Sequence, residues 1–264
     1  MLFDWMDNNS IDRQSQVMHL IYDMRMVTKR HLLAVTGLKE DNFNRILRAI
    51  RKMPSDSPFD WIQTLSIRGK QVEPAKCVYT LGKKGIAYVQ QQRKQDVRIR
   101  ESPASQMFHY VGLNSILQRA IETFGRDQIA WYSEGEQADI LTLQLRELEQ
   151  ADGDRRGIIR PDARIRVGGR EWLVEFDNAT EGPKQLEIKF HRYVELYDKL
   201  ESLRQTPILW VTTSEKRRDY LENNWNATMG ISYASHPSRP TSLFFTEGNE
   251  VKVFAPFTRR LASS

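Results

Sequence analysis

Apolar residues recur with helical spacing in two segments near the start of the chain. Residues 11–24 and 40–53 each place their apolar side chains on one face of a helix. These positions are Val17, Met18, Ile21 and Tyr22 in the first segment and Phe43, Ile46, Leu47 and Ile50 in the other. Between them, Thr28 can cap a helix over "KRHLLAVTG", which Gly37 would end. The pattern predicts three short helices, the last of them stopped by Pro54.

Two apolar, β-rich runs follow these helices. They are "WIQTLSI" (61–67) and "KCVYTL" (76–81), and they predict a β-hairpin with a basic tip at Arg68 and Lys70. Cys77 is expected at a buried position of the second strand. Three helices followed by a hairpin is the element order of a winged helix-turn-helix, in which the third helix enters the major groove of DNA.

The polar face of the third predicted helix carries side chains that suit DNA. These are Asn44, Arg45, Arg48 and Arg51, with Lys52 at the helix end. Asn and Arg read base edges, and other Lys and Arg mainly hold phosphates, so this face and the hairpin tip form a candidate interface with double-stranded DNA. Residues 1–104 hold 18 Lys and Arg against 11 Asp and Glu, whereas the remainder holds 21 against 23. The alternatives are a basic face that is merely solvated and a winged helix that docks another protein.

A polar stretch broken by Pro103, "QQRKQDVRIRESPASQ" (91–106), predicts a helix end and a linker. We therefore expect an α+β protein of two domains, one over residues 1–100 and one over residues 101–264. In the second domain, "QIAWYS", "PILWVTTS", "TSLFFTEG" and "EVKVFAPF" indicate strands, and the second of these has the apolar run of a buried parallel strand. The polar stretch 138–157 fits either a helix or a loop.

Composition limits the class of protein. Hydrophobic residues make up 40% of the chain and charged residues 28%, which is typical of a globular protein. The chain has no run of about 18 apolar residues and no signal-peptide pattern at its N-terminus, so we expect a cytoplasmic protein without a membrane span. Its single cysteine excludes a disulfide framework and a Cys-based zinc site.

The stretch "RPDARIRVGGREWLVEF" predicts a second hairpin, turning at Gly168-Gly169, since both positions of such a turn need φ > 0. Asp162 then lies opposite Glu175, and alternate residues share a face. One face carries Arg160, Asp162, Arg164, Arg166, Glu171, Leu173, Glu175 and Asp177. The other carries Pro161, Ala163, Ile165, Val167, Trp172, Val174 and Phe176. The apolar face is expected to pack into a core, leaving three carboxylates together at one end of the polar face.

Carboxylates that face one another repel unless a cation joins them. Asp162 and Glu175 are candidate ligands of Mg²⁺ or Mn²⁺, and such an ion would activate water for cleavage of a phosphodiester. The alternative is that Arg160, Arg164 and Arg166 neutralise the acids through cross-strand pairs. A long helix follows in "GPKQLEIKFHRYVELYDKLESLRQ", with a buried stripe of Leu186, Phe190, Tyr193, Tyr197 and Leu200. Lys189 flanks this stripe and can either lean toward the acids or reach into solvent.

The order of helix, strand, hairpin, helix and strand resembles the PD-(D/E)xK phosphodiesterase superfamily. That superfamily carries an Asp after Pro, matched by Pro161-Asp162, and a Glu-x-Lys on the next strand, of which Glu175 matches the Glu. Asp177 replaces the lysine, and Lys189 is the candidate for a lysine moved to the following helix, as some members have it. Lys189-x₃-Tyr193 resembles the Gln-x₃-Tyr spacing of RecB-like members. The resemblance implies catalytic roles for Asp162, Glu175, Asp177 and Lys189.

A closer resemblance is to the replication-relaxation family of plasmid and mobile-element proteins, which look like a winged helix followed by this nuclease-like core. It covers about residues 10 to 215 and rests on "YTLGKKGIAYV", "HYVGLNSIL", "RPDARI", "VEFDNATEG" and "KFHRYVELY". The resemblance implies DNA binding in replication control, mobilisation or transcription regulation.

Three hypotheses for the function follow. The first is a DNA-binding regulator that acts as a homodimer on a palindromic site. The second is a Mg²⁺-dependent endonuclease or nickase that uses the acid cluster and Lys189. The third is an accessory factor whose winged helix docks a replication or mobilisation protein.

Overall fold

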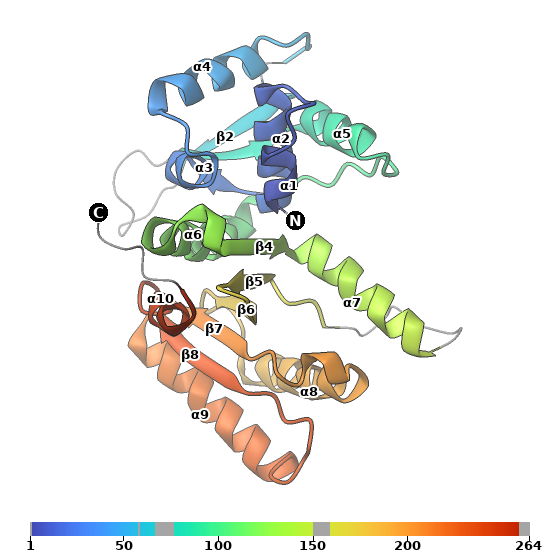
Figure 1. Ribbon diagram of the computed structural model, residues 1–264, viewed down its shortest axis with the longest axis vertical. Helices are drawn as coiled ribbons and strands as arrows, with labels where there is room; N and C mark the ends of the chain where they lie inside the picture. The colour runs from blue at the N-terminus through green and yellow to red at the C-terminus, as the bar shows by residue number, and fades with distance from the viewer. Residues whose placement is uncertain (1, 58, 67–76, 150–158, 259–264) are drawn as a thin grey trace. The chain divides into compact units, whose positions relative to one another are not determined.

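The computed structural model describes residues 2–57, 59–66, 77–149 and 159–258, and it is of mixed α/β class. The chain forms two compact units, Met1–Glu122 and Thr123–Ser264 (Figure 1). The α-helices and strands that begin in the described part of the first unit are α1 (Leu2–Met6), α2 (Arg13–Met24), β1 (Val27–Thr28), α3 (Lys29–Thr36), α4 (Glu40–Arg51), β2 (Ile62–Ser66), β3 (Cys77–Leu81), α5 (Lys83–Gln92) and α6 (Met107–Phe124). Among the described residues of this unit, the strands form one antiparallel sheet in the order β1-β3-β2.

Local signals in the sequence account for the helices of the first unit. The Thr28 side chain accepts a hydrogen bond from the His31 backbone N–H and caps α3, which ends at Gly37 with φ +65°. In α4, the predicted stripe of Phe43, Ile46, Leu47 and Ile50 is buried. The three predicted helices and both strands of the first hairpin are therefore confirmed.

The unit boundary lies at residues 122 and 123, later than the expected seam near residue 100. Hydrogen bonds of α6 explain the difference, because buried Asn114 donates from Nδ2 to the backbone oxygens of Met24 and Met26, at 2.9 Å each. The expected linker does lack regular structure between α5 and a 3-10 turn at Ala104–Gln106.

The second unit contains β4 (Ile129–Ser133), α7 (Glu134–Glu149), β5 (Ala163–Val167), β6 (Arg170–Asp177), α8 (Pro183–Lys199), β7 (Ile208–Thr212), α9 (Glu215–Ser232), β8 (Ser242–Thr246) and α10 (Val251–Phe254). Its strands form a mixed sheet in the order β4-β5-β6-β7-β8, with β6, β7 and β8 parallel. The strand Ile208–Thr212 is parallel and buried, as predicted.

The register of the second hairpin is the predicted one. Ala163 pairs with Val174 and Val167 with Arg170, and both turn glycines have positive φ, +56° at Gly168 and +87° at Gly169. A Cβ on Gly168 would come within 1.5 Å of the Phe257 backbone oxygen, so this turn also needs glycine for space.

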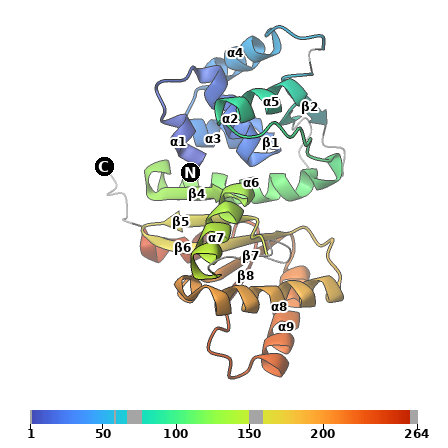
Figure 2. The same ribbon diagram turned by 90° about the vertical axis from the view of Figure 1, so that its right-hand side faces the viewer.

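Helices α7, α8 and α9 share one hydrophobic core on the sheet face that carries Leu173 and Trp210 (Figure 2). The predicted stripe of α8 lies in this core, from Leu186 to Leu200. The end of this hairpin face that carries Glu175 and Asp177 is therefore covered by helices, whereas Arg166 on the same face is exposed. Trp172, on the opposite face, packs edge-on against Phe254 and Phe257.

Two predictions about single segments are wrong. The stretch "EVKVFAPF" forms α10 and a 3-10 turn instead of a strand, because Pro256 has no N–H for a ladder and Phe254 is buried against Trp172. Cys77 lies on β3 as predicted but is exposed, since it is the end residue of the strand and the next residue, Val78, points into the core.

Candidate functional site

The outer face of α4 presents a row of cations. Arg45, Arg48, Arg51 and Lys52 are exposed and Asn44 is half-buried, on the side opposite the buried stripe. Arg45 donates to Asn42 Oδ1 at 3.4 Å, Arg48 to the Asn44 backbone oxygen at 3.3 Å, and Arg51 to Thr64 Oγ1 at 2.7 Å. Within the described part of the chain, none of these four cations forms an ion pair with a carboxylate. The face therefore keeps its positive charge available for an anionic partner.

Neighbouring cations on α3 behave differently. Lys29 pairs with Glu40 at 2.7 Å, and Arg30 pairs with Glu122 at 3.1 Å. The other two predicted DNA-binding residues, Arg68 and Lys70 at the hairpin tip, lie outside the described residues.

Glu175 is the centre of the predicted acid cluster, and it is 1% exposed. Its Oε2 lies 2.6 Å from Lys189 Nζ, and its Oε1 accepts a hydrogen bond from the Tyr193 hydroxyl. Both partners come from α8, one turn apart, so the helix that covers the sheet supplies a cation and a donor to the same carboxylate. Lys189 therefore leans toward the acids and also lies 3.4 Å from Glu181 Oε1.

Asp162 and Asp177 are held by other groups. Asp162 directly precedes β5, and its Oδ2 accepts a hydrogen bond from the Phe176 backbone N–H at 2.8 Å. Asp177, at the end of β6 and 6% exposed, receives two hydrogen bonds from Arg217 on α9, at 2.5 and 3.0 Å. Arg217 also donates to the Glu181 backbone oxygen at 2.7 Å, which ties the loop after β6 to α9.

Within the described ranges of the chain, the three hairpin arginines form no ion pair with Glu175 or Asp177. Arg164 pairs with Glu171 across the strands, and Arg160 and Arg166 are exposed. The cations that neutralise Glu175 and Asp177 are instead Lys189 and Arg217, from the two helices that pack on the sheet.

Burial sets the protonation of the cluster. It raises the pKa of Glu175 from an ordinary value of 4.5 to about 8, and the Lys189 ammonium opposes this rise. Burial alone would lower the pKa of Lys189, but the negative charges of Glu175, Asp162 and Glu181 outweigh it and raise the pKa above its usual range. The pKa of Tyr193 is raised by burial and by Glu175. Lys189 and Tyr193 thus remain protonated donors, and Glu175 is the group that titrates near neutrality.

In their present contacts, the carboxylates of Glu175 and Asp177 do not form a dedicated site for Mg²⁺ or Mn²⁺. A hard cation needs several oxygens converging on one point. Here both Glu175 oxygens face Lys189 and Tyr193, and both Asp177 oxygens face Arg217. Across residues that the structure describes, no group of three His, Cys, Asp or Glu side chains is arranged to hold a metal ion.

Reasoning from the sequence missed Arg217. Its signal is visible in retrospect, since it lies in the first turn of the helix that Ser214 caps, directly after β7. Because β6 and β7 are parallel, their carboxyl ends meet at one edge of the sheet, where Asp177 pairs with Thr212 in register.

Comparison with known proteins gives one match. The model of the family described as replication-relaxation matches residues 18–208, well over half of the chain. Searches of the curated proteins and of the solved structures found no match. No helix among the described residues is long and apolar enough to cross a membrane.

Proposed function

We propose that this protein is a DNA-binding regulator that reads duplex DNA with α4. The chain belongs to the replication-relaxation family, and this membership points to a role in plasmid or mobile-element replication or relaxation. Supporting this, the order α2, α3, α4, β2, β3 is that of a winged helix-turn-helix. In that arrangement the third helix lies in the major groove and its exposed face meets bases and phosphates.

The observation that carries the proposal is the unpaired charge on α4. The row of Arg45, Arg48, Arg51 and Lys52 lies on the face that the buried stripe leaves open, while Lys29 and Arg30 close by are matched with carboxylates. Four cations next to one another repel, and a phosphate backbone removes that repulsion and releases its counterions. Asn44, among them, has the side chain that bonds an adenine edge.

Alanine at both Arg45 and Arg48 is expected to weaken duplex binding by at least about tenfold, because an arginine that bonds a base edge is worth about 1–3 kcal/mol. The slope of log affinity against log salt should also fall by about 0.9 for each phosphate that the variant no longer neutralises. Fluorescence anisotropy with a labelled duplex, over a salt series, measures both quantities.

The matched control is alanine at both Lys29 and Arg30, which removes two charges that are already paired. Its affinity is expected to stay close to that of the wild type. Equal reductions of affinity in the two double variants would show that only net charge matters and that α4 has no special part in binding.

For the second unit we propose the fold of a PD-(D/E)xK nuclease without the nuclease activity. Its role in this proposal is dimerisation and further DNA binding. In support, its hairpin, following helix and parallel strand have the order of that superfamily, with Asp162, Glu175 and Lys189 in one cluster. A homodimer on a palindromic site follows from the two-fold logic of such regulators. We also propose that the DNA-bound regulator recruits a replication or mobilisation protein as a further partner.

Metal-dependent endonuclease or nickase activity is the second candidate, and the clustering of Asp162, Glu175 and Lys189 is the observation that favours it. The ion pairs weigh against it, because the acids already have cations from their own chain. We therefore expect no nicking of supercoiled plasmid with Mg²⁺ or Mn²⁺, and no metal binding by calorimetry that Glu175→Ala abolishes. Nicking that disappears in Glu175→Ala but persists in the exposed control Glu187→Ala would establish the nuclease instead.

A further inference from the structure

A strained turn ends α2. Arg25 has φ 63° and ψ −68°, and the Met26 N–H donates to the Met24 backbone oxygen at 2.7 Å. This is a three-residue γ-turn of the rarer kind, which is unfavourable for a residue with a side chain. Strain of this kind persists where the surroundings enforce it, and it concentrates at binding sites.

Asn114 enforces this turn from outside it. Its Nδ2 donates to the backbone oxygens on both sides of Arg25, those of Met24 and Met26, and its side chain is buried. The backbone conformation of Arg25 is therefore held by a residue of α6 and not by local preference.

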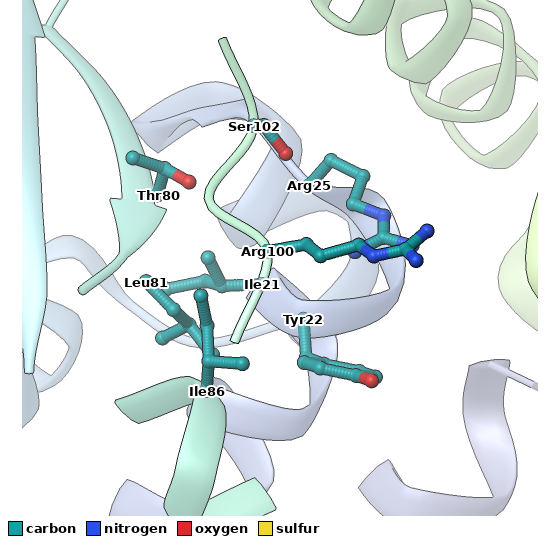
Figure 3. Close-up of a pocket in the computed structure, with 8 residues that line it drawn as sticks. All are labelled: Ile21, Tyr22, Arg25, Thr80, Leu81, Ile86, Arg100 and Ser102. Atoms are coloured by element: carbon teal, nitrogen blue, oxygen red, sulfur yellow. The ribbon is translucent and has the colours of Figure 1, made fainter. Parts of the chain in front are cut away.

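The Arg25 side chain lines a cavity of about 190 Å³, together with Tyr22, Ile86, Gln90, Arg98 and Arg100. Figure 3 shows the adjoining hollow, in which the guanidinium groups of Arg25 and Arg100 point in the same direction. Buried Gln90 fixes the backbone of Arg98 beside the cavity. Its Oε1 accepts a hydrogen bond from the Arg98 N–H at 2.9 Å, and its Nε2 donates to the Arg98 backbone oxygen at 3.0 Å. The cavity thus has one buried polar side chain, Gln90, in its wall and three arginines around it, of which Arg25 is half-buried and Arg98 and Arg100 are exposed.

Among the residues that the structure describes, no carboxylate lines this cavity. Of the acids beside it in sequence, Glu101 accepts a hydrogen bond from Gln63, and Asp96 lies 3.9 Å from the lining Arg98, with both side chains exposed. Arg98 is therefore the lining arginine with an acid partner, and the charge available to a ligand comes from Arg25 and Arg100. Arg25 and Arg100 form no ion pair within the same described ranges. Gln90 also donates to the Tyr22 hydroxyl at 3.1 Å, which leaves the hydroxyl proton to be donated to a ligand.

We propose that the cavity formed by Tyr22, Arg25, Gln90, Arg98 and Arg100 binds a phosphoryl group, held by the Arg25 and Arg100 guanidiniums and the Tyr22 hydroxyl. A guanidinium donates two parallel hydrogen bonds to a pair of phosphate oxygens, a geometry that a monatomic halide cannot use. A phosphoryl group presents several such oxygens, so two guanidiniums and a hydroxyl can all bond it at once. The volume lies below the range of about 300–1,000 Å³ typical of drug-sized ligands, so the pocket takes one small anionic group. Such a group arrives either on a small phosphate compound or on the backbone of bound DNA.

The test measures the melting temperature of the full chain with inorganic phosphate and with pyrophosphate, against chloride at matched ionic strength. Arg25→Gly relieves the strained φ while removing the charge. Lys94→Gly is its matched control, since exposed Lys94 also has positive φ, 54°, and does not line the cavity. We expect the wild type and Lys94→Gly to show the phosphate-dependent rise, and Arg25→Gly and Arg100→Gln to lose most of it. Arg25→Gly is expected to melt no lower than wild type without phosphate, which shows that it folds.

A second arm uses a labelled duplex with the same variants. Weaker duplex binding in Arg25→Gly and Arg100→Gln, with a salt slope lower by about 0.9 for each, identifies the DNA backbone as the source of the phosphate. If these two variants bind the duplex as the wild type does but have lost the rise in melting temperature with phosphate, the source is a small phosphate compound. The proposal is overturned if neither the phosphate response nor the duplex affinity distinguishes these variants from Lys94→Gly. Neither arm involves Arg45 or Arg48, so failure here is separate from failure of the α4 interface.

Discussion

Replacing Arg217 with alanine is expected to destabilise the second unit by about 3 kcal/mol. The change leaves the Asp177 carboxylate, whose side chain is 4% exposed, without the cation that bonds both of its oxygens. Breaking a buried pair from one side costs about 3–5 kcal/mol, and we take the low end because the Arg217 side chain is 14% exposed. Urea denaturation followed by tryptophan fluorescence measures the destabilisation, since Trp131, Trp172, Trp210 and Trp225 all lie in this unit.

The neighbouring Arg218→Ala serves as the matched control. Arg218 pairs with Asp219 on the exposed side of α9, where an ion pair contributes about 0–1 kcal/mol. Adding Asp177→Asn to Arg217→Ala should recover part of the stability, because a neutral amide is cheaper to bury than an unpaired charge. If Arg217→Ala were no more destabilising than Arg218→Ala, the pair with Asp177 would have no role in holding the acid cluster.

Stability of the second unit is expected to fall as the pH rises from about 4.5 to about 8, and Glu175→Gln is expected to remove that part of the fall. Burial raises the folded-state pKa of Glu175 to about 8 from an ordinary value of 4.5. Below pH 4.5 both the folded and unfolded states hold the proton, so this contribution is fully present. Between the two values the unfolded state loses its proton first, and stability drops by up to about 1.4 kcal/mol per pH unit. Urea titrations at several pH values give the curve.

Two further variants sharpen this test. Tyr193→Phe removes a hydrogen bond that lowers the pKa of Glu175, so the fall should continue to a higher pH. Glu187→Gln removes one exposed acid from the same helix and controls for net charge. A Glu175→Gln curve that keeps the wild-type slope between pH 5 and 8 would assign the pH dependence to other groups.

Local chemistry made much of this fold predictable. Thr28 and Gly37 mark the ends of α3 because each satisfies backbone groups within a few residues of itself. Gly168 and Gly169 fix the register of the second hairpin, since a two-residue turn leaves only one pairing of the strands. That register was enough to place Asp162 beside the Glu175 strand.

The partners of the acids were harder to predict. Lys189 could be expected near them from its place beside the α8 stripe, but the sequence left open whether it turned toward the sheet or toward solvent. Arg217 lies 40 residues from Asp177, and only the parallel pairing of β6 with β7 brings the start of α9 to that carboxylate. The segment ending in Phe254 was predicted to be a strand and forms helix α10, because packing of Phe254 against Trp172 overrides the alternating pattern of the segment.

The sequence by itself determined helices α2, α3, α4 and α8, both hairpins, the basic face of α4 and the gathering of acids at one end of a sheet, because each of these follows from neighbours along the chain. The tertiary structure alone decided that Lys189 and Arg217 neutralise those acids and that Asn114 holds Arg25 in its strained turn. The physical reason is that ion pairs and strained turns depend on groups far apart in sequence, whose approach is set by how helices pack on a sheet and on one another.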